Sequence, residues 1–271
     1  MLKIFDLHND YYFKFKNNKK NKYVEKTDNL KHNIISAIWT SELNNEESMR
    51  EIKKAKSFVN QYSNLFLGIE DLHFLTKDNL ENFILTKPIY ASLTWNTCNA
   101  LAGGSHEGGN LTKFGKSVVK RLEQNNIQID TAHLNEESFM DFSKITKKPM
   151  LCSHTAFYGV NQNSRNLKDY QLKMIIESGG LVGLCLVSDF INGTRRCLIE
   201  DVALHIDYFA CKFGINNLAI GTDFYGTKHL PRNANNYESL ILGLSNKLTK
   251  MGYTEKSLNK IFYENAQSFF A

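Results

Sequence analysis

Six side chains that can bind metal ions lie at or just after the ends of short apolar runs in this sequence. They are His8, Asp10, Glu70, His133, His154 and Asp223. His8 and Asp10 stand one residue apart in "IFDLHND", so in a strand both side chains point the same way. A lone histidine at a strand end is more often structural. Six metal-capable side chains at five strand ends instead indicate a shared metal site.

The mixture of ligand types indicates which ion would bind and what it would do. Three imidazoles and two or three carboxylates suit zinc or a similar first-row ion. Two ions fit, because a carboxylate such as Glu70 can bridge ions about 3.5–4 Å apart. The predicted chemistry is hydrolysis, in which bound ions lower the pKa of a water and polarise a carbonyl or phosphoryl oxygen. Asp223 would then orient that water or shuttle its proton.

Eight apolar runs alternate with stretches of helical spacing, and this order predicts a single (β/α)8 barrel domain over residues 1–271. The runs are short and continuous, which is typical of strands covered on both faces. They span 3–8, 33–39, 65–70, 89–95, 127–133, 150–154, 180–187 and 217–223. The stretch 71–88 fits the helical pattern poorly. In such a barrel the carboxyl ends of the strands form the active site, and that is where the six side chains fall.

Several residues predict where the helices begin and end. Asn135 before "EESF" is expected to cap one helix, and Asn166 to cap another over 167–178 that stops at Gly179. An apolar stripe over 202–213 should end at Gly214. His205 lies beside that stripe and is expected to be a packed helix residue.

Composition and charge exclude several classes of protein. The chain has 271 residues, 42% of them hydrophobic, and its net charge of +5 is too small to indicate nucleic-acid binding. The lysine-rich stretch 14–26 is expected to be a solvated loop. No apolar run approaches the roughly 20 residues that span a bilayer, and the first strand begins too early to leave room for a signal segment. Five cysteines without a CxxC pair predict a reduced, cytoplasmic protein.

Several sequence blocks, in order, make the chain similar to a known family. The blocks include "DLHND", "GIED", "LTWNTCNALAGG", "KPMLCSHTAF", "SRNLKDYQLKMIIESGGLVGL" and "NLAIGTDFYG", and they run from residue 6 to residue 270. The chain resembles the membrane dipeptidase (renal dipeptidase) family, metal-dependent peptidases on an amidohydrolase-like barrel. The order and spacing of the blocks make the resemblance specific.

The resemblance implies a role for each candidate residue. His8 and Asp10 would bind one zinc ion, Glu70 would bridge, and His133 and His154 would bind the second ion. Asp223 would handle the proton of the attacking water. Arg165 would pair with the terminal carboxylate of the substrate, for which its guanidinium fork is well suited.

The implied function is a binuclear zinc dipeptidase that hydrolyses short dipeptides, with a D-residue at the C-terminal side as one candidate substrate. A homodimer is a candidate assembly, and neither a membrane nor a nucleic acid is an expected partner. One departure from many relatives is Trp95, which replaces a histidine after "LT" and is expected to make the substrate pocket more apolar. Two alternatives remain open. One is another amidohydrolase activity on the same metals, such as N-acyl amino acid deacylation or lactam or lactone opening; the other is a binding homologue that has lost turnover.

Overall fold

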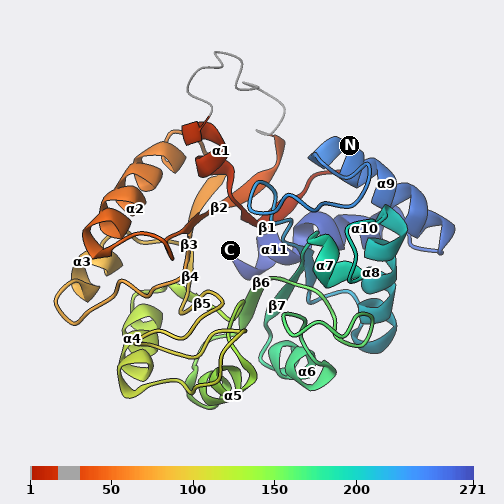
Figure 1. Ribbon diagram of the computed structural model, residues 1–271. Helices are drawn as coiled ribbons and strands as arrows, with labels where there is room; N and C mark the ends of the chain where they lie inside the picture. The colour runs from red at the N-terminus through yellow and green to blue at the C-terminus, as the bar shows by residue number, and fades with distance from the viewer. Residues whose placement is uncertain (1, 18–30) are drawn as a thin grey trace. The chain divides into compact units, whose positions relative to one another are not determined.

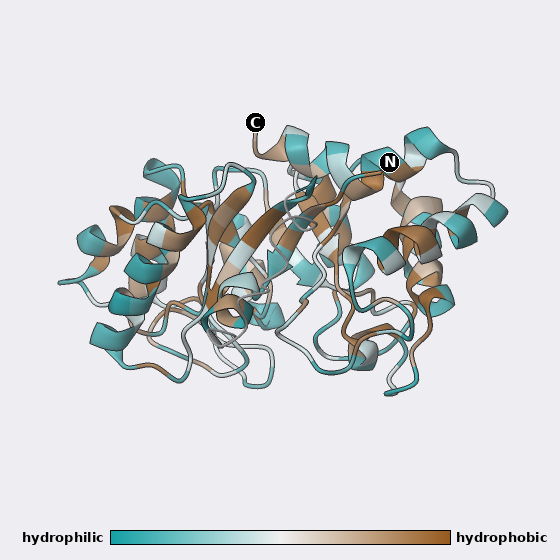
Figure 2. Ribbon diagram, turned by 90° about the horizontal axis from the view of Figure 1, so that it is seen from above, coloured by the Kyte–Doolittle hydropathy of each residue, from teal (hydrophilic) through white to brown (hydrophobic). Residues whose placement is uncertain are grey.

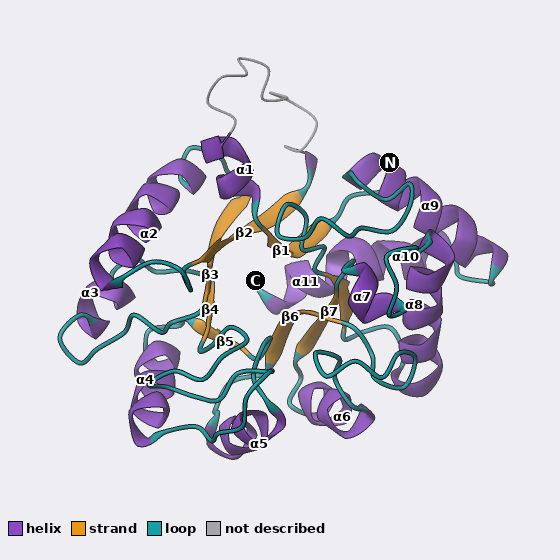
Figure 3. Ribbon diagram, viewed as in Figure 1, coloured by secondary structure: helices purple, strands orange, loops and turns teal. Residues whose placement is uncertain are grey.

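The computed structural model describes residues 2–17 and 31–271. Among these residues, eight strands alternate with helices, and the hydrogen-bonded strand order runs from β1 to β8 and closes on itself (Figures 1 and 3). The pairs β1–β8, β3–β4, β4–β5, β5–β6 and β7–β8 are parallel. This topology confirms the predicted (β/α)8 barrel.

All eight predicted strands are present, although several are shorter than expected. They are β1 Phe5–Asn9, β2 Asn33–Trp39, β3 Leu65–Glu70, β4 Tyr90–Ser92, β5 Gln128–Asp130, β6 Leu151–Thr155, β7 Leu181–Leu184 and β8 Leu218–Ile220. The helices are α1 Tyr11–Asn17, α2 Asn45–Val59, α3 Leu80–Ile84, α4 Lys113–Gln124, α5 Glu136–Ile145, α6 Asp169–Glu177, α7 Ser188–Ile191, α8 Ile199–Phe213, α9 Tyr237–Lys250, α10 Glu255–Asn259 and α11 Asn265–Phe269, with a π-helical segment, η2, at Lys260–Glu264.

The chain divides into two compact halves. The terminal half comprises the described residues up to 34 together with 153–271, and the central half comprises 35–152. The boundaries fall inside β2 and β6, so β1, β7 and β8 belong to the terminal half and β3, β4 and β5 to the central half.

In the terminal half the parallel strands β1, β8 and β7 contact η2, α11 and α6, and α8 packs against α9. Every residue of these three strands is buried, as expected for parallel strands covered on both faces. Figure 2 shows the strands in hydrophobic colours and the helices with hydrophilic stretches. Val202, Ile206 and Phe209 of the apolar stripe on α8 are buried, and α8 ends at Gly214, whose φ is 79°, as the sequence predicted.

The central half is built on the neighbouring strands β3, β4 and β5. At Gly68 a Cβ atom would collide with the Tyr90 ring and with Ile35, so the close packing of these strands requires glycine there. The Asn135 side chain accepts a hydrogen bond of 2.8 Å from the Ser138 amide, which confirms it as the N-cap of α5.

One predicted helix cap is wrong. The helix α6 begins at Asp169 with Lys168 in the cap position, whereas the Asn166 amide donates to the backbone oxygens of Asn161 and Phe190. These tertiary bonds tie the loop after β6 to α7, and a local capping pattern cannot reveal them. The weakly patterned stretch 71–88 contains the short helix α3.

Two expectations from the sequence concern membrane-spanning helices and the lysine-rich stretch. No helix in the described ranges is both long and apolar enough to span a membrane. Most of the lysine-rich stretch, from residue 18 onward, lies outside the described residues.

His205 predicts how stability depends on pH. It is fully buried, its Nδ1 accepts from the Phe157 amide, and burial lowers its pKa to about 4, against the opposing influence of the Ile191 carbonyl and Asp201. The unfolded chain binds a proton near pH 6.5 and the folded chain does not, so stability falls as the pH drops from about 6.5 towards about 4. We expect the free energy of unfolding, measured by urea denaturation, to fall by up to about 1.4 kcal/mol per pH unit in this range. The fall should be smaller in His205→Gln. An equal slope in both proteins would contradict this assignment.

Candidate metal centre

Three of the predicted site residues lie together in the terminal half, at the ends of β1 and β8. His8 lies on β1, Asp10 directly follows this strand, and Asp223 lies three residues after β8. One ligand atom from each lies within 4.8 Å of the others. The Asp223 amide donates to the His8 carbonyl and the Asp10 amide to the Phe224 carbonyl, both at 2.9 Å, which holds the two strand ends side by side.

A glycine leaves room for the two carboxylates of this cluster. A Cβ atom added at Gly226 would collide with both Asp223 Oδ1 and Asp10 Oδ2. Asp223 has a φ of 58°, in the left-handed region where a non-glycine residue is uncommon. Backbone conformations of this kind are frequent at functional sites, where the surrounding structure holds the residue in a conformation that it would otherwise avoid.

The electrostatics of the cluster depend on burial. Burial raises the pKa of Asp10 well above its usual range, and the nearby carboxylates of Asp223 and Asp6 add to this. Burial also raises the pKa of Asp223 to about 7, although the Arg165 guanidinium opposes the rise. Burial, with a contribution from Arg165, lowers the pKa of His8 to about 3, so this imidazole is neutral. The buried carboxylate of Asp10 and the partly exposed carboxylate of Asp223, beside an imidazole, form a donor set that a divalent cation fits.

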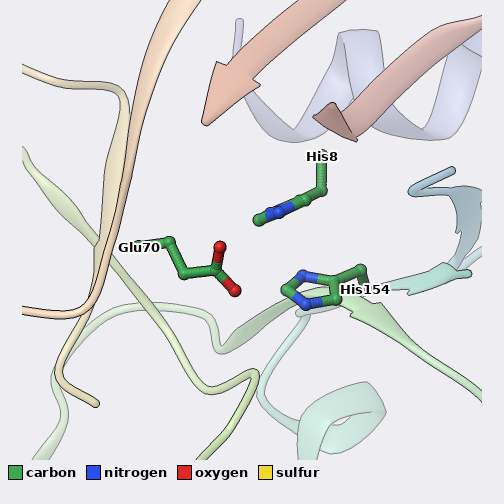
Figure 4. A group of neighbouring side chains, drawn as sticks. All are labelled: His8, Glu70 and His154. Carbon is green, nitrogen blue, oxygen red and sulfur yellow. The ribbon is translucent and has the colours of Figure 1, made fainter. Parts of the chain in front are cut away.

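His154 and Arg165 complete the terminal half of the predicted site. The rings of His8 and His154 lie with their centroids 3.8 Å apart; Figure 4 shows both, together with Glu70, which belongs to the central half. Arg165 is 5% exposed, and its Nη2 lies 3.2 Å from His154 Nε2. The guanidinium also lies over the Phe190 ring, 5.4 Å from its centroid. All five predicted residues of this half are therefore neighbours.

The central half brings together Glu70 and His133. Glu70 is the last residue of β3, and its Oε1 lies 2.8 Å from His133 Nε2. His133 lies three residues after β5 with a φ of 69°, so it belongs to a loop and not to the predicted strand. The other ring nitrogen, Nδ1, lies 2.9 Å from Asn96 Oδ1. Because an amide oxygen only accepts, Nδ1 is the donor in this contact, and Nε2 is the ring nitrogen that faces Glu70 and that would bind a metal ion.

Trp95 also lies in the central half, close to His133. It follows β4 by three residues, and its ring centroid is 6.0 Å from that of His133. Trp39, at the end of β2, makes an edge contact with Trp95 at 5.2 Å. Both indoles are partly exposed, so they form an apolar surface beside the His133 imidazole.

Sequence reasoning missed Asn96, Trp39 and Asp6, which contact the predicted site residues. Asn96 directly follows Trp95, but nothing in the spacing shows that its side chain meets His133. Trp39 ends the second strand, so a search of strand ends for large aromatic side chains could have found it. Asp6 lies two residues before His8 in the same strand, and that spacing was the available signal.

Comparison with known proteins identifies the family. The family model "Membrane dipeptidase (Peptidase family M19)" matches residues 16–270. This chain belongs to the membrane dipeptidase family, peptidase family M19. The prediction of a metal-dependent dipeptidase, a hydrolase, is therefore confirmed, and so is the resemblance found in the sequence.

One relative and two solved structures are also similar to this chain. A protein of Klebsiella pneumoniae described as "Uncharacterized protein in pqqA 5'region" is 30% identical over 183 residues, which cover 63% of this chain and 67% of the relative. The metallo peptidase of Rhodobacter sphaeroides, solved with a phosphinate mimic of L-Ala-D-Ala, has a TM-score of 0.85 at 19% identity and covers 99% of this chain and 98% of its own. The dipeptidase AC, also a metallo peptidase of family M19, has a TM-score of 0.86 at 20% identity with the same coverage. At such identities the two structures support the barrel fold.

The bond between Asn96 and His133 predicts a change in metal affinity. In Asn96→Ala the His133 ring loses the acceptor that fixes its tautomer, and we expect metal affinity to fall by about 10–100-fold, as is usual when such an acceptor is removed. Titration against a chromogenic chelator measures this. Ser105→Ala is the matched control, because it removes the other hydrogen bond of Asn96 Oδ1 and leaves the bond to His133. Equal affinities in wild type and Asn96→Ala would contradict the role of Asn96.

Proposed function

We propose that this chain hydrolyses the peptide bond of short dipeptides with two zinc ions, and that both halves together form one catalytic domain over residues 1–271. The observation that carries the proposal is the cluster of His8, Asp10 and Asp223, whose ligand atoms lie within 4.8 Å of one another in a chain of the dipeptidase family. When bound, the zinc ions would lower the pKa of a water molecule and polarise the scissile carbonyl.

The proposed ligands come from both halves of the chain. His8 and Asp10 would hold one ion, His133 and His154 would hold the other, and Glu70 would bridge the two. In the terminal half, the proposal is supported by the neighbouring rings of His8 and His154. In the central half, it is supported by the 2.8 Å approach of Glu70 Oε1 to His133 Nε2, since both atoms are metal-ligand types.

Arg165 is proposed to bind the C-terminal carboxylate of the dipeptide. Its side chain is buried, and its Nε atom has no hydrogen-bond partner among the described residues. A buried guanidinium with unused N–H groups can bind both oxygens of a carboxylate. Asp223 is proposed to orient the attacking water and to pass its proton to the leaving amine, because it lies beside His8 and Asp10 and is less buried than either.

The substrate is proposed to be a dipeptide with an apolar side chain, with a D-residue at its C-terminal side as one form. The relative from Rhodobacter sphaeroides binds a mimic of L-Ala-D-Ala, which supports this class of substrate. The partly exposed indoles of Trp39 and Trp95 supply an apolar surface in the central half. The free thiols of Cys98, Cys185, Cys197 and Cys211 support the proposal of a reducing, cytoplasmic compartment.

The first test compares a good dipeptide with its C-terminal amide. Losing a charged partner in a buried pair typically costs about 2–5 kcal/mol, so wild type should prefer the free acid by at least about 30-fold in kcat/KM. Arg165→Met should lose most of this preference. Lys168→Met, which removes a nearby cation that lies over Tyr158, is the control and should retain it. Equal hydrolysis of acid and amide by wild type would favour deacylation or lactam or lactone opening instead.

The second test separates the metal ligands from the proton-handling residue. Protein purified without chelator should contain close to two equivalents of zinc, and Glu70→Ala should lose most of both because a bridging ligand is gone. Asp223→Asn should keep its metal and lose at least about 100-fold in kcat. Elemental analysis and steady-state kinetics check both points. One equivalent of metal in metal-replete wild type, or metal loss in Asp223→Asn, would contradict these assignments.

A further inference from the structure

We propose that the Ser153 hydroxyl is a shared hydrogen-bond acceptor that fixes the tautomers of both His8 and His154, so that each ring presents Nε2 for metal binding. Ser153 is fully buried on β6, directly before His154. The proposal assigns a positioning role to a residue that the sequence analysis did not select. It rests on the proposed function only for the statement that these two histidines bind metal.

The contacts of His154 determine where its proton lies. A guanidinium group only donates hydrogen bonds. Because Arg165 Nη2 lies 3.2 Å from His154 Nε2, this ring nitrogen is the acceptor and carries no proton. A neutral imidazole in that state carries its proton on Nδ1, which lies 2.9 Å from Ser153 Oγ. The serine oxygen therefore accepts a hydrogen bond from His154.

The same oxygen also faces His8. Ser153 Oγ lies 3.4 Å from His8 Nδ1, and a hydroxyl oxygen has two lone pairs, so it can accept from both rings. Under this proposal the His8 proton lies on Nδ1, which leaves the Nε2 lone pair on the side of Asp10, whose Oδ2 lies 4.0 Å away. Both rings then have the tautomer that a metal site at Nε2 requires.

Two glycines hold the backbone of Ser153 in place. A Cβ atom added at Gly183 on β7, or at Gly221 after β8, would collide with the carbonyl oxygen of Ser153. Larger side chains there would push this part of β6 away. Glycine at both positions lets the neighbouring backbones approach Ser153 closely. This packing holds the Ser153 backbone in place, and with it the hydroxyl oxygen that faces the two rings.

Removal of the Ser153 hydroxyl should therefore change the tautomers of the two histidines while the fold persists. Without this acceptor, either ring can place its proton on Nε2, and that form has no lone pair there for a metal ion. Loss of such an orienting partner typically costs about 10–100-fold in metal affinity. The carbon skeleton of Ser153→Ala still fits the strand, so the fold should persist.

The experiment reads the tautomers directly in the metal-free full-length chain. Two-bond ¹H–¹⁵N correlation spectra of ¹⁵N-histidine protein, assigned with His8→Gln and His154→Gln, should show Nδ1–H tautomers for both rings in wild type. In Ser153→Ala at least one ring should shift towards Nε2–H, and zinc affinity should fall by about 10–100-fold. Ser153→Thr, which keeps a hydroxyl, should restore both. Ser48→Ala, which removes another buried hydroxyl on α2, should change neither.

The outcomes separate this proposal from the proposed function. A Nε2–H tautomer of His8 or His154 in wild type would overturn the role of Ser153 without the need for any variant. Unchanged tautomers in Ser153→Ala would overturn it as well. Absence of dipeptide hydrolysis in wild type, with the expected tautomers present, would overturn only the proposed substrate class.

Discussion

The buried carboxylate of Asp6 holds the end of β1 against the segment that follows β8. Its oxygens accept from the Thr222 amide at 2.8 Å and from the Tyr237 hydroxyl at 2.6 Å, and Asp6 pairs in register with Ile220. Burial raises the pKa of Asp6, while these hydrogen bonds oppose the rise. An unsatisfied carboxyl group at this depth would cost several kcal/mol. The strand ends that carry the histidine and carboxylates of the terminal cluster therefore keep their register only while this network is intact.

A second requirement applies to every histidine of the candidate centre. An imidazole binds metal through one nitrogen, so the other needs an acceptor that fixes the tautomer. In the central half Asn96 supplies an amide oxygen to His133. In the terminal half the Ser153 oxygen faces two rings. Neutral acceptors suit this place, because a further buried carboxylate would add to the repulsion that already raises the pKa of Asp10.

The sequence was enough to predict the strands and the metal-capable side chains, because both follow from local patterns. Short apolar runs mark buried parallel strands, and polar residues at their ends mark the catalytic face of a barrel. Interactions between segments distant in sequence were not predictable. Asn166 matches a capping pattern, yet its side-chain amide donates hydrogen bonds to the backbone oxygens of Asn161 and Phe190. Ser153 has no signal of its own, since its role depends on two rings that meet only in the fold. The fifth and eighth strands are predicted to reach His133 and Asp223, but both strands end three residues earlier. Both residues take left-handed backbone conformations, which a strand does not allow.

The contact between Arg165 and His154 links metal binding to substrate binding. The lone pair of His154 Nε2 accepts from the Arg165 guanidinium, and that lone pair is the one proposed to bind a metal ion. One lone pair serves one partner, so the guanidinium and a metal ion would compete for His154 Nε2. Under the proposed function one guanidinium therefore faces both a metal ligand and the carboxylate of the substrate, and its unpartnered Nε is a donor for that carboxylate.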